Sequence, residues 1–339
     1  MHQDRGLSGE SRRFRKWLKD MGKRLQAGKV ERPSILVVGC GALGTACLFH
    51  LRKIAQVFGY DCDRARSEEL SRAGAGFLGA GRVRPVVFNV AATMECYRGK
   101  VFDGVIFATK CRGLRPAVRV FSASGRATRV LFLQNGGDDL LWAKSLLRGS
   151  RICRGVTTMA VSLQERSRVR LYTAGETFLG SIDRQREGAQ WFAHVFAAAG
   201  LNVHLVKNIA GAVWAKLIFN AVMNPLPVLC SQSYAVLHRD RLLYALARDA
   251  IREGVAVARK AKICLAFDPL AKLRAVREGR LNTDNYFGSM YADATMGRAT
   301  EIEELTGLLV RQAKRLGVPV PRLDTIYALT RARLEKKDG

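Results

Sequence analysis

SILVVGCGALG, residues 34–44, joins a short apolar run to a glycine-rich turn. The run has the composition of a buried strand, and the stretch that follows, as far as Lys53, is amphipathic. In a turn of the form G-x-G-x-x-G, glycines permit a tight bend and bring the backbone close to a pyrophosphate at the next helix N-terminus. This turn consists of Gly39, Cys40, Gly41, Ala42, Leu43 and Gly44. The order predicts a Rossmann-type dinucleotide-binding domain, with a glycine-rich turn without a ligand as the alternative.

The next expected strand, residues 56–61, ends in a segment of mixed charge, DCDRAR. This segment lies roughly 20 residues beyond the glycines, where such a domain reads the adenosine ribose. A carboxylate of Asp61 or Asp63 would bind a free 2′-hydroxyl and favour NAD, whereas Arg64 and Arg66 would bind a 2′-phosphate and favour NADP. The sequence favours NADP(H), although general surface basicity also explains two arginines.

Polar residues directly follow two further expected strands. Residues 104–109 (GVIFAT) lead into Lys110, and residues 129–133 (RVLFL) lead into Gln134 and Asn135. Because ligands bind at the C-terminal ends of parallel strands, Lys110 and Asn135 are candidates to contact the nicotinamide, the ribose or the substrate. Further strands are expected at 155–163, 169–173, 177–180 and 202–206, with a helix at 184–199.

Residues 209–230 read IAGAVWAKLIFNAVMNPLPVLC, and their strongly polar side chains are Lys216, Asn220 and Asn224. The spacing i, i+4, i+8 puts these three on one stripe of an otherwise apolar, buried helix. An unpaired buried amide costs about 1–3 kcal/mol, so polar groups should lie opposite. A central lysine and two late prolines argue against a transmembrane helix. An interior helix whose polar groups are merely satisfied by neighbours is the alternative to a functional site.

The chain has 339 residues, which is enough for two domains with separate cores. Only helices are expected from Ile209 onward. The predicted fold is therefore a Rossmann-type α/β domain over residues 34–206 followed by an all-α domain over residues 207–334. Lys and Arg total 56 against 29 acidic residues, a formal net charge of +27. The positive electrostatic field of such a charge attracts anionic metabolites, but it attracts nucleic acid and acidic lipid equally.

Eight cysteines are scattered without a CxxC pair or a Cys/His spacing typical of metal ligands. This usage indicates reduced thiols, a reducing compartment and no metal site. Residues 1–33 form a separate basic extension with an amphipathic helix expected over residues 11–26. The expected location is the cytoplasm, or the mitochondrion if the extension acts as a transit segment.

Two segments carry a resemblance to a known family. VWAKLIFNAVMNPL (213–226), followed by GSMYADATMGRATEIEELTGLLVRQAKRLGVPVP (288–321), resembles the ketopantoate reductases, or 2-dehydropantoate 2-reductases. GCGALG, ATK and LQNG match the Rossmann half of that family, and the similarity extends from Ser34 to Arg331. The resemblance implies NADPH-dependent reduction of a 2-oxo acid, most simply ketopantoate to pantoate in pantothenate and coenzyme A biosynthesis.

The resemblance also implies roles for individual residues. Lys216 matches the lysine that protonates the keto oxygen, and Glu301 matches the glutamate that binds the substrate hydroxyl and helps set the protonation state of the lysine. Burial lowers a lysine pKa and a nearby carboxylate raises it, so the balance between the two decides that state. The remaining matches are Asn220, Asn224 and Ser289 for the substrate, Lys110 and Asn135 for substrate and cofactor, and Arg64 for the 2′-phosphate.

Other readings stay open for several of these positions. Thr300 would cap a helix whose dipole suits an acid at Glu301, which would make Glu301 structural. Residues 137–139 (GDD) depart from the family pattern in the loop beside the nicotinamide. The tyrosines Tyr234 and Tyr286 depart from it in the cleft, so the reductase could act on a different ketone or 2-oxo acid. A non-catalytic basic binding protein is the third hypothesis, against which the intact set of polar site residues argues.

The expected partner is a small anionic 2-oxo acid rather than a specific nucleic acid. The sequence leaves the oligomeric state open, a homodimer included.

Overall fold

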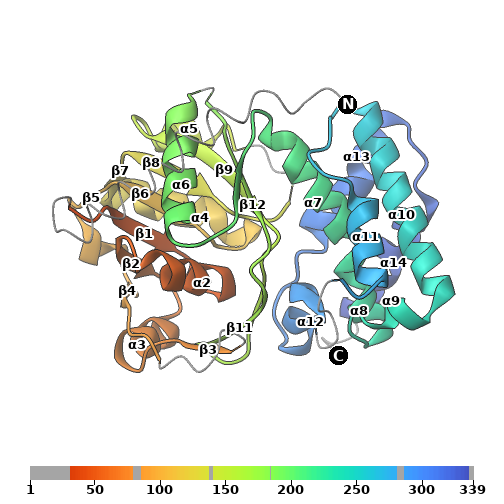
Figure 1. The fold of residues 1–339 in the computed structure, drawn as a ribbon, viewed down its shortest axis with the longest axis horizontal. Helices are drawn as coiled ribbons and strands as arrows, with labels where there is room; N and C mark the ends of the chain where they lie inside the picture. Colours follow the sequence, from red (N-terminus) through yellow and green to blue (C-terminus); the bar gives the residue numbers. More distant parts are fainter. Residues whose placement is uncertain (1–30, 79–84, 137–139, 184, 281–285, 336–339) are drawn as a thin grey trace.

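The structure is a computed structural model that describes residues 31–78, 85–136, 140–183, 185–280 and 286–335. The expected N-terminal helix and the GDD segment at 137–139 lie outside these described residues. Figure 1 shows two parts side by side, one built around a sheet and the other made of helices.

An eight-stranded sheet, ordered β13-β12-β9-β8-β6-β1-β2-β4, forms the first part (Figure 1). Neighbours pair in parallel except for β9 with β12, which are antiparallel. Residues 35–38 of β1, which lies between β6 and β2, are fully buried, and this part of the strand is apolar without alternation, as expected when both faces of a sheet are covered. The strands are β1 (Ser34–Val38), β2 (Gln56–Tyr60), β4 (Asn89–Ala91), β6 (Gly104–Phe107), β8 (Arg129–Phe132), β9 (Arg151–Thr157), β12 (Thr177–Ser181) and β13 (Val203–Leu205).

Helices connect the strands of this sheet and cover its faces. They are α2 (Ala42–Leu51), α3 (Arg64–Arg72), the 3-10 turn η1 (Met94–Tyr97), α4 (Cys111–Ser124), α5 (Ala143–Leu146) and α6 (Arg186–Ala198). The expected strand–turn–helix order around the glycines is confirmed by β1 and α2, and the expected helix at 184–199 corresponds to α6.

Two sequence expectations for this part are wrong. The expected strand 155–163 is split between two sheets, because residues 155–157 belong to β9 and residues 160–163 pair with β11 in a different sheet. That second sheet consists of β3 (Gly76–Leu78), β10 (Ala160–Leu163) and β11 (Arg168–Thr173), and a small pair is formed by β5 (Val101–Phe102) and β7 (Arg126–Ala127). Strands β10 and β11 cover the outer side of α2, so this helix is buried almost all round and is not amphipathic.

The second part contains helices only among its described residues, as expected. They are α7 (Ile209–Met223), α8 (Pro225–Cys230), α9 (Val236–Arg239), α10 (Arg241–Lys260), α11 (Pro269–Arg277), α12 (Gly288–Thr295), the π-helical turn η2 (Glu303–Gly307), α13 (Leu308–Leu316) and α14 (Pro321–Glu335). β13 ends at Leu205 and α7 begins at Ile209, so our proposed domain division near Lys207 falls between them.

Residues 209–230 are the one described stretch long and apolar enough to cross a membrane by length and composition. Within the fold, 72% of the most apolar window of this stretch is buried by other parts of the chain. Helix α7 packs against α10 on one side and against β9 and β12 on the other. Its apolar composition is therefore explained by its central position between the two parts (Figure 1).

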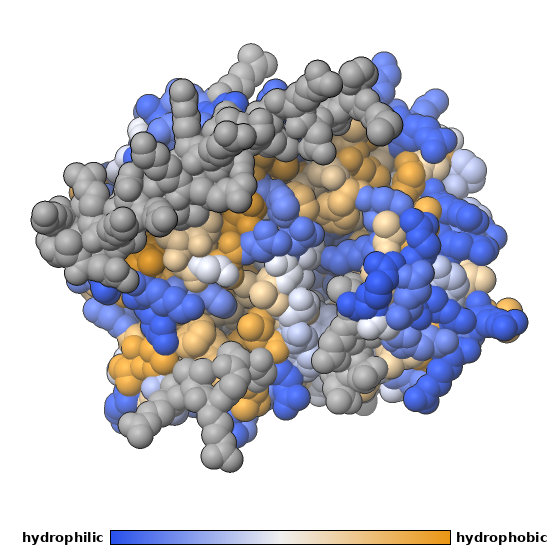
Figure 2. All heavy atoms as spheres, viewed as in Figure 1, coloured by the Kyte–Doolittle hydropathy of each residue, from blue (hydrophilic) through white to orange (hydrophobic). Residues whose placement is uncertain are grey.

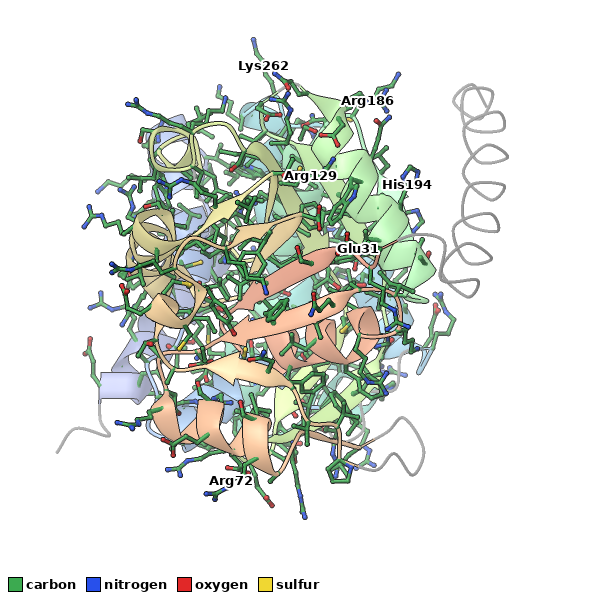
Figure 3. All side chains as sticks on the ribbon, turned by 90° about the vertical axis from the view of Figure 1, so that its left-hand side faces the viewer. Glu31, Arg72, Arg129, Arg186, His194 and Lys262 are labelled. Carbon is green, nitrogen blue, oxygen red and sulfur yellow. The ribbon has the colours of Figure 1, made fainter. Side chains whose placement is uncertain are left out.

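Charged side chains dominate the outer surface of the helical part. Figure 2 shows hydrophilic residues gathered there, on the right-hand side of the view. In the view of Figure 3, Arg72 of α3 and Lys262, which follows α10, project outward at opposite ends of the molecule. These exposed positions provide control substitutions for the experiments below.

Candidate active site

A cavity of about 580 Å³ lies between the sheet and the helical part. The sheet part contributes the glycine-rich turn and the segments that follow β6 and β8, and the helical part contributes α7, α11, α12 and the segment before η2. The expected site residues that line it are Gly41, Ala42, Leu43, Lys110, Asn135, Lys216, Asn220, Asn224, Ser289 and Glu301. Gly39, Cys40, Gly44 and Arg64 are not among its lining residues.

Lys216 extends from the middle of α7 into this cavity. Its ammonium group has no hydrogen bond or ion pair within the described part of the chain. Burial, followed by the positive charge of Lys272, lowers the pKa of Lys216 to about 8, while the carboxylate of Glu301 acts in the opposite direction. An amine with this pKa is mostly protonated at neutral pH and can give up its proton readily, as a general acid must.

Glu301 reaches the cavity from the segment between α12 and η2. One carboxylate oxygen accepts a hydrogen bond of 3.4 Å from the backbone N–H of Cys111, at the N-terminus of α4, and the other accepts one of 3.3 Å from the side-chain amide of Asn135. The carboxylate thus lies at the positive end of the α4 helix dipole. Both donors belong to the sheet part, so Glu301 joins the two parts of the molecule.

The structural alternative for Glu301 is not supported by the local geometry. The helix begins at η2 with Ile302 as its N-cap, and no side chain caps it, Thr300 included. The neighbouring acids have other partners, since Glu303 pairs with Arg311 at 3.1 Å and Glu304 pairs with Arg112 at 3.1 Å. Glu301 is thus the acid of this segment that faces the cavity.

Asn220 and Asn224 share the stripe of Lys216 but differ in their contacts. The side chain of Asn220 has no hydrogen-bond partner in the described part of the chain and faces the cavity. Asn224 is buried, and its side-chain oxygen accepts a hydrogen bond of 3.0 Å from the hydroxyl of Tyr234. Tyr234 packs edge-on against Tyr286, which also lines the cavity. The hydroxyl of Tyr234 therefore occupies the side-chain oxygen of Asn224, and the amide nitrogen of Asn224 is left for a ligand.

Lys110 follows β6 and lies at the boundary of the two parts. Its ammonium group forms an ion pair of 2.6 Å with Asp293 of α12, and this carboxylate also pairs with Arg298 at 3.0 Å. Asp293 is 4% exposed, so the two cations compensate for the burial of its charge. Ser289, on the same helix, lines the cavity nearby.

The glycine-rich turn fits the pyrophosphate of a dinucleotide. Gly39 has a φ of +90°, and a side chain at Gly44 would collide with the carbonyl of Gly39. Both glycines are therefore needed for the backbone conformation of the turn. Gly41 is the N-cap of α2, no side chain caps this helix, and its first turn contains no acid. The first N–H groups of α2 thus remain available to an anion in the cavity.

Cys40 takes part in this turn only through its backbone. Its thiol is buried in the core, where burial raises its pKa, and its backbone N–H donates a 2.8 Å hydrogen bond to Asp61. The other oxygen of Asp61 accepts the N–H of Asp63 at 2.9 Å, and Asp63 in turn caps α3. Both acids at the end of β2 therefore stabilise the backbone around the turn.

Two family models match the chain in succession. The model described as "Ketopantoate reductase PanE/ApbA" matches residues 35–184, and the model described as "Ketopantoate reductase PanE/ApbA C terminal" matches residues 208–334. The chain belongs to the ketopantoate reductase family. It is accordingly an oxidoreductase with a dinucleotide-binding half, as the resemblance of its motifs implied.

Similar proteins extend over nearly the whole chain. The 2-dehydropantoate 2-reductase of Archaeoglobus fulgidus is 27% identical over 300 residues, which are 88% of this chain and 96% of that protein. The corresponding protein of Pyrococcus horikoshii is 26% identical, with 88% and 97% covered. A PanE/ApbA family ketopantoate reductase from Ralstonia eutropha JMP134 has a similar solved structure, with a TM-score of 0.77, 27% identity, and 90% and 100% coverage.

Sequence reasoning missed one residue that lines this ketopantoate-reductase-type cavity and one that pairs with a lining residue. Asp293, the partner of Lys110, occurs in the quoted motif but received no role. Lys272 lines the cavity from α11, although its segment PLAKLRAVR reads as an ordinary basic surface helix. Nothing in the local pattern distinguishes this lysine from its basic neighbours, because its burial depends on the packing of α11 against α7.

Proposed function

We propose that this protein reduces a 2-oxo acid to the 2-hydroxy acid with NADPH, and that ketopantoate is its simplest substrate. The observation that carries the proposal is the arrangement of Lys216 and Glu301, which line one cavity together with the glycine-rich turn. Similar proteins over most of the chain have the name 2-dehydropantoate 2-reductase, which supports the same substrate.

The dinucleotide, when bound, supplies the hydride to the keto carbon. Reduction places negative charge on the keto oxygen, and Lys216 donates the proton that neutralises it. The unpaired ammonium group of Lys216 is poised for this role because no protein acceptor competes for its protons in the described part of the chain. Glu301 keeps Lys216 charged, since its carboxylate raises the pKa that burial lowers.

The substrate is held by the amides and the hydroxyl around Lys216. Asn220 and Ser289 line the cavity with polar groups free to bind it, whereas Asn224 offers its amide nitrogen only. Glu301, held by Asn135 and by the N-terminus of α4, accepts a hydrogen bond from a substrate hydroxyl. The substrate-binding groups of the helical part are therefore positioned in part by contacts from the sheet part.

We assign the 2′-phosphate of NADPH to Arg64. Its side chain is 84% exposed, and its partner Glu68, at 2.9 Å, is itself exposed, so the pair is weak and easily exchanged. Arg66 is less available, because its guanidinium donates to the carbonyl of Arg166 at 3.2 Å. Asp61 and Asp63, which would bind the ribose 2′-hydroxyl of NADH, accept hydrogen bonds from backbone N–H groups instead. This supports the preference for NADPH.

A second candidate is a 2-oxo acid with a bulky apolar substituent. The residues that form the aromatic wall of the cavity are the tyrosines Tyr234 and Tyr286 and the phenylalanines Phe178, Phe219 and Phe267. Aromatic rings bury large apolar groups well and offer few hydrogen bonds, which favours such a substituent over a small hydroxylated one. This wall is the observation that favours the second candidate.

The decisive experiment follows dinucleotide oxidation by the purified protein with ketopantoate, with straight-chain 2-oxo acids and with aromatic 2-oxo acids, each with NADPH and with NADH. The highest kcat/KM for ketopantoate with NADPH supports the first candidate, and a preference for aromatic acids supports the second. The absence of turnover with every 2-oxo acid and both cofactors would contradict the proposal.

A further inference from the structure

The cavity contains a second amine besides Lys216. Lys272 extends from α11 across α7, with its nitrogen 5.1 Å from the ring centre of Phe219 and 5.8 Å from that of Phe267. Both rings line the cavity as well. In the described part of the chain this ammonium group has no hydrogen bond and no ion pair.

The other charged groups that line the cavity all have partners. Lys110 pairs with Asp293 at 2.6 Å. Glu176 contacts His204 at 2.9 Å, and Asp268 caps α11 through the N–H of Leu270. Glu301 accepts its two hydrogen bonds from the sheet part, and the buried Arg154 behind the cavity donates to the carbonyl of Gly136. Among the described residues, the amines of Lys216 and Lys272 form no ion pair.

These two positive charges act on each other. The charge of Lys272 lowers the pKa of Lys216, and burial lowers the pKa of Lys272 to about 8, an effect that the carboxylate of Glu176 partly offsets. Holding two unpaired ammonium groups in one partly desolvated cavity is unfavourable. An anionic ligand between them removes this penalty, and a 2-oxo acid carries one carboxylate and one developing oxyanion.

We propose that Lys272 binds the carboxylate of the 2-oxo acid while Lys216 faces its keto oxygen. Lys272 is then a specificity-determining residue that makes the enzyme select acids over neutral ketones. This inference rests on the proposed function and adds the group that recognises the acid. The rings of Phe219 and Phe267 hold the lysine stem in place, so the charge is presented at a fixed position.

The test compares a 2-oxo acid that the wild type reduces with its neutral primary amide, in the wild type and in three variants. Lys272→Met removes the charge and keeps an apolar stem against the two rings, and Lys272→Arg keeps the charge. Lys262→Met removes one exposed, outward-projecting charge that does not line the cavity (Figure 3). We expect Lys272→Met to lower the acid-to-amide ratio of kcat/KM by at least about tenfold, chiefly through the KM of the acid. Lys272→Arg should retain most of the ratio, and Lys262→Met should retain all of it.

Other outcomes separate this inference from the proposed function. An unchanged acid-to-amide ratio in Lys272→Met overturns the inference, and so does weaker NADPH binding by this variant, which would assign Lys272 to the cofactor. If the wild type reduces no 2-oxo acid, the proposed function fails. The role of Lys272 is then decided by calorimetric titration of oxamate into protein saturated with NADP+, where equal affinity of wild type and Lys272→Met overturns it.

Discussion

The side-chain amide of Asn135 donates a hydrogen bond of 3.3 Å to the carboxylate of Glu301, which lies 166 residues further along the chain. Asn135 follows β8 of the sheet part, and Glu301 precedes η2 of the helical part. This contact therefore links the sheet part to the carboxylate that raises the pKa of Lys216.

Replacing Lys216 by alanine removes the proposed proton donor. We expect kcat to fall by about 10²- to 10⁴-fold, the usual contribution of a positioned general acid. Dinucleotide affinity, measured by fluorescence titration, should stay unchanged. Lys262→Ala, at an exposed site, is the control and should retain full activity. Unimpaired turnover by Lys216→Ala would remove this lysine from the mechanism.

The pH dependence of reduction should reflect the pKa of Lys216, about 8. Because only the protonated amine donates, kcat/KM should decline as pH rises through about 8. Glu301→Gln removes the charge that raises this pKa, so the decline should begin at lower pH. Lys272→Met removes the charge that lowers it and should shift the decline to higher pH. A pH profile that is the same in all three proteins would contradict the assignment.

Arg64→Ala should weaken the binding of NADPH much more than that of NADH. Loss of a charge-assisted contact to the 2′-phosphate corresponds to roughly 10- to 100-fold in affinity. Arg72→Ala, on the same helix and exposed, is the matched control (Figure 3). Equal effects on both cofactors would indicate that Asp61 or Asp63 reads the ribose instead.

Tyr234→Phe should destabilise the fold. The substitution removes the donor to the buried side-chain oxygen of Asn224, and an unsatisfied buried acceptor costs about 1–3 kcal/mol. The free energy of unfolding can be measured by urea denaturation. Tyr286→Phe serves as the control, because the hydroxyl of Tyr286 has no hydrogen-bond partner in the described part of the chain. Similar stabilities for the two variants would show that the hydroxyl of Tyr234 contributes little.

Salt should slow substrate capture. The net charge of +27 attracts an anionic acid over distances that added salt screens, with a Debye length of about 10 Å at 0.1 M. We expect kcat/KM for the acid to fall with ionic strength while kcat stays constant, and the neutral amide to show no such fall. A salt-independent kcat/KM for the acid would exclude steering by this charge.

Much of the site could be predicted from local patterns. The polar spacing of Lys216, Asn220 and Asn224 on an apolar run indicated one stripe facing polar groups, and all three line the cavity. The glycine pattern indicated the turn before α2, of which Gly41 lines the cavity while Gly39 shapes the turn from behind. In both cases the signal is a residue periodicity or a backbone requirement within a single element.

Contacts between distant segments could not be predicted in this way. The burial of α2 on both sides depends on the strands β10 and β11, which lie more than a hundred residues after α2 in the sequence. The hydrogen bond between Tyr234 and Asn224 turned an expected ligand-binding amide oxygen into an internal acceptor. Each contact depends on which elements meet in space, and the residue types alone are compatible with several arrangements.

The sequence by itself determined the dinucleotide-binding turn, the helical second part and the position of Lys216 on the polar stripe of its helix. These features follow from backbone geometry and from the spacing of apolar and polar residues within short segments. The tertiary structure alone decided that Glu301 faces the cavity and that Lys272 is a second amine in it, with no ion pair among the described residues. The physical reason is that burial and charge interactions, which set a pKa and a binding preference, are properties of the neighbours that folding brings together.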